Sequence, residues 1–197
     1  MIRRSLACLT LLLIPFLFGG CATVKEMVAL RSVDFRYDRI SDAAVAGIAL
    51  SRITSYETLN AADVARLALA VTSKDVPLDL VVHLEGRNPE TNNVTARMIA
   101  MDWAYLVDDR ETVSGSFTQA LSFPPGAPTD VPVRVSLDLV RFFGGDGRAL
   151  LDTALSLAGQ KTSGKRGALR ILPSIDTPVG PMKYPAPIVI PLTAGTR

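Results

Sequence analysis

The sequence contains one histidine, His83, and this residue is the first to test for catalytic chemistry. A Ser-His-Asp hydrolase site needs its histidine beside a serine, held by a carboxylate within a cleft. Alternation along residues 78–85 instead places His83 on the polar face of a strand, together with Asp79 and Glu85. The chain has no Gly-x-Ser-x-Gly motif. These observations favour a structural histidine, and we expect the protein not to be an enzyme.

The remaining chemical groups indicate neither a metal nor a cofactor. A zinc site needs several His or Cys ligands, and the chain has one histidine and two cysteines. Residues 159–165 have the spacing of the first part of a phosphate-binding loop, but Arg166 stands where Ser or Thr is required. We expect a helix end and a basic loop there. The carboxylates of residues 108–111 fit a solvated turn, whereas Asp102 interrupts an apolar face and would need a partner if buried.

Cys21 has the most specific chemical context in the chain. Two arginines near the start precede an apolar stretch over residues 6–18. This stretch is shorter than the roughly 20 residues that a membrane span requires, and its order is typical of a secretory leader. The small residues Gly19 and Gly20 then lead directly to Cys21. The segment resembles the lipobox of bacterial lipoproteins, although Phe18 stands where that motif usually has Leu.

In lipoproteins, the motif cysteine receives a diacylglycerol on its thiol and becomes the new N-terminus after cleavage. The resemblance therefore implies a signal peptide over residues 1–20, a tether over 21–32, and attachment to a membrane through Cys21. Ala22 stands where Asp commonly retains lipoproteins in the inner membrane, which favours the outer membrane, facing the periplasm. The alternative, in which Cys21 is only a small residue of a leader, stays open.

The composition limits what the exported domain can bind and how it is stabilised. Removal of the leader takes away Cys8, so that no disulfide can form. The 21 basic residues of the full chain fall to 19 when the two leader arginines are removed, against 19 acidic residues. A neutral chain without a large basic cluster is a poor nucleic-acid binder, and we expect no nucleic-acid partner.

Hydrophobic periodicity predicts a mainly β domain with one or two short helices. Strands are indicated by alternating apolar residues, and the stretch 97–107, which is apolar on both faces, predicts a central strand. A helix is predicted to begin at the cap Asn60, and another to run from near Asp146 to Gly159. Short strands joined by Pro/Gly turns are typical of a β-sandwich. The expected strands cover residues 33–37, 78–85, 97–107, 112–123, 131–139, 169–172 and 188–190.

Two quoted stretches carry a resemblance to a known family. The first, "VVHLEGRNPETNNVTARMIAMDWAYLVDDRETVSGSF", has a strand ending in Asn88-Pro89 and then an aromatic strand. The second, "LRILPSIDTPVGPMKYPAPIVI", carries Gly-x-x-x-x-Pro, here Gly180 to Pro185. The pattern is similar to the late-embryogenesis-abundant (LEA) type 2 family, also called the water-stress and hypersensitive-response (WHy) domain. Asn and Pro together end a strand and set a turn, which favours a structural role for these motif residues.

The resemblance implies an immunoglobulin/fibronectin-III-like β-sandwich over residues 33–197 and a non-enzymatic role in stress and desiccation tolerance. Three functions stay open at this point. The protein would protect the cell envelope by binding, serve as a structural subunit of an envelope or secretion assembly, or hold a lipid in an apolar groove between its sheets. The expected partners are therefore the membrane, an envelope protein, or an apolar ligand.

Overall fold

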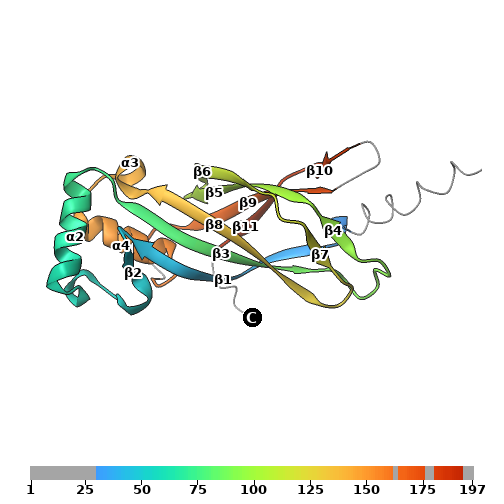
Figure 1. The fold of residues 1–197 in the computed structure, drawn as a ribbon, viewed down its shortest axis with the longest axis horizontal. Helices are drawn as coiled ribbons and strands as arrows, with labels where there is room; N and C mark the ends of the chain where they lie inside the picture. The colour runs from blue at the N-terminus through green and yellow to red at the C-terminus, as the bar shows by residue number, and fades with distance from the viewer. Residues whose placement is uncertain (1–29, 162–163, 176–179, 193–197) are drawn as a thin grey trace, which may run out of the picture.

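The computed structural model describes residues 30–161, 164–175 and 180–192. The predicted signal peptide, Cys21 and most of the tether lie outside these ranges. Within them, the chain folds into two packed antiparallel sheets and a separate two-stranded ribbon, β4–β7, with helices gathered at one end of the long axis (Figure 1). The predicted β-sandwich is confirmed. None of the described helices combines the length and apolar character needed to cross a bilayer.

The first sheet has the strand order β2-β1-β3-β8, with every neighbouring pair antiparallel. Its centre is β3, where alternate side chains turn to the interior and are almost fully buried. Only one face of β3 contacts the core, and this is why apolar and polar residues alternate in its sequence. The bounds of the four strands are β1 (Asp34–Val45), β2 (Ile48–Ala49), β3 (Pro77–Arg87) and β8 (Pro128–Asp138).

The second sheet has the order β10-β9-β5-β6, and β11 also pairs with β9. The stretch predicted as one central strand is divided at Ile99: β5 is central, while the preceding residues form β4 and pair with β7 instead. The predicted strand 112–123 is likewise two strands, β6 and β7. The bounds are β4 (Ala96–Met98), β5 (Ala100–Val107), β6 (Arg110–Phe117), β7 (Leu121–Phe123), β9 (Gly167–Ile175), β10 (Met182–Lys183) and β11 (Ile188–Pro191).

Both predicted helices are confirmed. Asn60 caps α2 (Ala61–Thr72), its side-chain oxygen accepting from the backbone N–H of Asp63 at 2.9 Å. Asp146 caps α4 (Gly147–Leu157) by accepting from the N–H of Ala149, also at 2.9 Å. A short helix, α3 (Leu139–Phe143), begins at a residue predicted as the end of a strand. Two 3-10 turns, η2 (Leu50–Arg52) and η3 (Tyr56–Thr58), complete this end of the molecule.

One continuous core fills the space between the sheets and continues under α4. Side chains of both sheets meet there with exposed fractions near zero, and α4 closes the helical end with its apolar face. At the opposite end, Phe123 of β7 packs edge-on against Phe35 of β1, with ring centroids 5.6 Å apart. Gly86 lies beneath both rings, because a Cβ there would stand 2.4 Å from a Phe123 ring carbon. A glycine is therefore required where the ribbon β4–β7 folds onto the first sheet.

Candidate functional site

The first candidate site surrounds His83 on the outer face of the first sheet. His83 Nε2 lies 2.9 Å from the hydroxyl oxygen of Ser41, and Nδ1 lies 2.9 and 3.0 Å from the two carboxylate oxygens of Asp130. Arg39 Nη2 is 3.2 Å from the same Nδ1. Three adjacent strands, β1, β3 and β8, supply these residues. A serine at one ring nitrogen and an aspartate at the other is the order of contacts in a Ser-His-Asp triad. Nothing in the sequence predicts that Ser41 and Asp130 contact the histidine.

The hydroxyl of Ser41 has two neighbours in this cluster. It donates its proton to Asp42 Oδ2 at 2.9 Å, whereas the direction of its contact with His83 Nε2 depends on which ring nitrogen carries the hydrogen. At Nδ1, Arg39 can only donate and the Asp130 carboxylate can only accept, so these two contacts favour opposite tautomers. Asp42 thus competes with His83 for the serine proton, and the cluster cross-links three strands.

A bulged strand brings Ser41 to the histidine. The pairing of β1 with β3 shifts register between Tyr37 and Arg39 and again between Ser41 and Ala44. Asp42, inside the second shift, has a positive φ of 52°. β-bulges redirect side chains in this way, but they leave no distinct trace in an alternating sequence. The cluster could therefore not be assembled from residue types and spacing alone.

Asn88 of the Asn-Pro motif is fully buried at the end of β3. Its side-chain amide donates to the carbonyls of Val94, at 3.0 Å, and Phe123, at 2.8 Å. Its side-chain oxygen accepts from Asn92 Nδ2 at 2.8 Å, and its backbone carbonyl accepts from the N–H of Gly126, also at 2.8 Å. One side chain thus holds the loop 88–95 against β7. Each of these contacts joins Asn88 to another part of the same chain.

The second motif lies at the same end of the molecule, beside the first described residue (Figure 1). Gly180 has a positive φ of 107°, a conformation that glycine adopts without strain. Tyr184 turns inward, and its hydroxyl donates to the backbone carbonyl of Leu30 at 3.2 Å. Pro185 lines a shallow hollow together with Leu30 and Met182. The Gly-x-x-x-x-Pro segment therefore lies beside Leu30, where the described part of the chain begins.

Asp102 and two acidic residues of the predicted turn, Asp108 and Glu111, have cationic partners. Asp102, which interrupts an apolar face, is partly exposed and pairs with Lys183 of the same sheet. Asp108 accepts from the backbone N–H of Arg166 at 3.1 Å and pairs with Lys165 at 3.0 Å, and these contacts lower the pKa of its carboxyl. The basic loop after α4 is thus tied to the β5–β6 turn. Among the described residues, no group of three His, Cys, Asp or Glu side chains could hold a metal ion.

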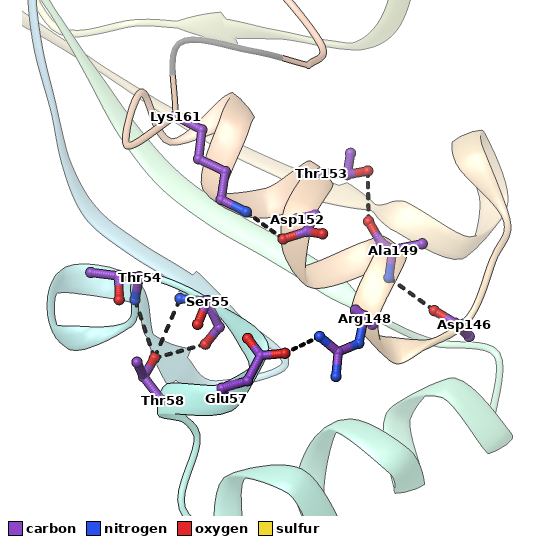
Figure 2. Close-up of polar contacts among 10 residues, drawn as sticks. All are labelled: Thr54, Ser55, Glu57, Thr58, Asp146, Arg148, Ala149, Asp152, Thr153 and Lys161. Atoms are coloured by element: carbon purple, nitrogen blue, oxygen red, sulfur yellow. Dashed lines mark hydrogen bonds and ion pairs between the residues drawn. The ribbon is translucent and has the colours of Figure 1, made fainter.

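The helical end is joined by exposed polar contacts. Figure 2 shows Arg148 of α4 reaching Glu57 of η3, while Lys161 pairs with Asp152 on the same helix. The Arg148 guanidinium also lies over the Tyr56 ring, 4.7 Å from its centroid. The hydrogen bond from Arg148 lowers the pKa of Glu57 to about 2. These contacts orient η3 against α4.

Helix α2, at the outermost position of this end, buries little of its own surface. Leu67 is its only fully buried residue, and Gly147 of α4 packs against that side chain. Leu69 is 71% exposed. Its exposed neighbours on the helix are Ala65, Arg66 and Thr72. The tip therefore presents a helix face that nothing in the described chain covers.

Comparison with known proteins identifies structural similarity but no family. No protein-family model matches the sequence, and the search of curated proteins gives no match. The chain is similar to a crystal structure of a protein from Archaeoglobus fulgidus at 12% identity and a TM-score of 0.35, covering 84% of this chain and 98% of that chain. It is also similar to the solution structure of a candidate LEA protein at 14% identity and a TM-score of 0.40, covering 89% of this chain and 79% of that chain.

One of these two structures carries the LEA name that the sequence resemblance suggests. At TM-scores this low, neither likeness carries an argument about function. Membership of the WHy family stays a prediction from the motif residues.

Proposed function

We propose that this protein is a non-enzymatic lipoprotein of the bacterial envelope, held through Cys21 at the periplasmic side of the outer membrane, and that it acts by binding. One observation carries the proposal. Leu30, the first described residue, lies beside Met182 of β10, and β10 lies toward the opposite end of the long axis from the uncovered helix α2 (Figure 1). A chain tethered at residue 21 would hold the β10 end at the membrane and present the α2 end to the compartment.

The contacts of Ser41 support binding rather than catalysis, because its hydroxyl donates its proton to Asp42 Oδ2. Protection of the envelope under water stress is the role that the WHy-like motifs suggest. It would follow from binding at the tip, without turnover.

A structural subunit of an envelope or secretion assembly is the second candidate, and the exposed tip favours it. Leu69 on α2 is 71% exposed, and Leu67 is the only fully buried residue of that helix. The third candidate, a lipid held between the sheets, is less well supported. Core side chains of both sheets, such as Leu80, Val82 and Ile171, already occupy that space with exposed fractions of 2% or less.

The anchor is tested by intact-protein mass spectrometry on membrane fractions, with wild type beside Cys21→Ser. The expected wild-type mass is that of residues 21–197 plus acyl chains, and the substitution is expected to remove both the acyl mass and the membrane attachment. An unacylated chain in the wild-type sample would refute the anchor.

Binding at the tip is tested in cells with a photo-crosslinking residue at position 69, beside the same residue at position 189. Val189 is a matched control, because it is also apolar and 55% exposed but belongs to β11, in the body of the sandwich. A discrete adduct from position 69 alone would support the tip as the binding surface. Equal adducts from both positions, or none from position 69, would contradict it.

A further inference from the structure

We infer that the tether end of the domain carries a second membrane-binding element, an apolar and basic patch around β10 that rests on the lipid surface. The inference rests on the proposed function, because it takes the anchor at Cys21 as given. It adds a contact by the folded domain itself, which would fix the orientation of the domain as well as its attachment. The contact patch consists of Arg31, Pro181, Met182, Lys183, Pro185 and Ala186.

The side chains of the contact patch are turned outward. Met182 is 41% exposed, and its neighbours Pro181, Pro185 and Ala186 are exposed as well. Tyr184 is the exception: it is turned inward and bound to the Leu30 carbonyl. This bond fixes the segment beside the point where the tether enters. The patch is thus an exposed apolar surface on a segment held in place by the fold.

The length of the tether restricts what can cover the patch. Nine peptide units separate Cys21 from Leu30, and a fully extended chain of that length spans roughly 30 Å. An acylated Cys21 would therefore keep the patch within about that distance of the bilayer at all times. A weak contact is then formed repeatedly, because the local concentration of lipid is high. No comparable argument applies to the α2 face at the far end.

The charges of the patch match an anionic lipid surface. Arg31 has no ion-pair partner among the residues that the structure describes. Lys183 is paired with Asp102, but the Lys183 side chain is still 62% exposed. Basic groups next to exposed apolar side chains are the combination by which proteins bind at the interface of anionic bilayers. The predicted partner is thus the head-group region of the membrane that holds the anchor.

The test uses the acylated protein in vesicles of phosphatidylethanolamine and phosphatidylglycerol. With Cys21 acylated and Cys8 removed with the leader, an introduced cysteine is the only reactive thiol. Met182→Cys is labelled with an environment-sensitive fluorophore, and quenching by lipids with a nitroxide near the head group is measured. Asp34→Cys is the matched control, because Asp34 is exposed and only four residues beyond Leu30 but outside the patch. Leu69→Cys reports on the far end.

Several-fold stronger quenching at position 182 than at positions 34 and 69 is the expected result. Equal quenching at 182 and 34, in a sample whose mass shows the acyl chains, would overturn the patch while leaving the anchor intact. A blue-shifted but unquenched label at 182 would also overturn it, because the patch would then be covered by protein. A mass without acyl chains would refute the proposed function itself, which separates the two failures.

Discussion

Replacement of Asn88 by alanine is expected to destabilise the domain more than any change at an exposed loop residue. The alanine keeps the backbone of the turn but removes both side-chain bonds to the Val94 and Phe123 carbonyls. Proline follows at position 89, so the turn keeps its fixed φ. The variant therefore isolates the contribution of the buried amide.

The magnitude follows from the burial of the two carbonyls. The bond to Phe123 is buried, and leaving a buried acceptor without a donor costs about 1–3 kcal/mol. The bond to Val94 is only partly buried, so water can replace part of it, and we assign it about 1 kcal/mol. The expected loss is thus about 2–4 kcal/mol of a total stability of roughly 5–15 kcal/mol.

Equilibrium urea unfolding of residues 22–197 measures this loss, because that chain contains the whole described core. Trp103, the only tryptophan, reports unfolding from its half-buried place beside Gly115. With a urea dependence of about 2 kcal/mol per M, the Asn88→Ala midpoint should fall by about 1–2 M. Asn93→Ala, an exposed change in the same loop, should shift the unfolding free energy by less than about 0.5 kcal/mol. Equal midpoints for the two variants would refute the argument from buried acceptors.

Four further outcomes are expected. A fluorophosphonate probe should not label Ser41, and labelling that disappears in Ser41→Ala would show that the hydroxyl is activated. Gly86→Ala should cost about 1–3 kcal/mol in urea unfolding, because its Cβ would overlap an aromatic ring; an unchanged midpoint would contradict that overlap. Tyr105→Phe should leave the melting temperature unchanged or raise it, because the buried Tyr105 hydroxyl has no hydrogen-bond partner among the described residues; a clear drop would reveal a partner. The contact with Arg148 lowers the pKa of Glu57 from 4.5 to about 2. The stabilisation from this ion pair is therefore complete above pH 4.5 and is lost as the pH falls toward 2. In Arg148→Gln the Glu57 titration, followed by NMR, should return toward 4.5, and an unmoved midpoint would exclude Arg148 as the cause.

Strands in which apolar and polar residues alternate without a break are predicted correctly from the sequence. The points at which the chain changes its partner strand are not. Strands β3 and β8 alternate strictly because one face meets the core along their whole length. The break at Ile99 is invisible in the sequence, because residues 97–107 are apolar on both faces, so that a change of partner strand and of the buried face leaves no mark there. The alternation of apolar residues predicts that the strand continues to Leu139. The structure instead begins helix α3 at this residue, where its side chain is buried in the core and so fits the same apolar pattern.

The candidate sites divide in the same way. His83 could be placed on a polar strand face from its neighbours, whereas its contacts with Ser41 and Asp130 depend on bulges and on pairing across three strands. The Asn88 turn is local, so its position follows from the Asn-Pro dipeptide itself. Its buried contact with Phe123, 35 residues later, does not. Local chemistry is thus readable in sequence, and long-range register is not.

The positions of the motif residues give the molecule two unlike ends. The Asn-Pro turn and the Gly-x-x-x-x-Pro segment both lie at the end where residue 30 enters, away from the helices (Figure 1). Tyr184 binds Leu30, and Asn88 holds the loop 88–95, so this end is cross-linked within itself. If the anchor at Cys21 is correct, these bonds would stiffen the part of the domain that meets the bilayer. A change at Asn88 should then disturb the orientation of the domain on the membrane as well as its stability, whereas a change at Leu69 should affect only binding at the tip.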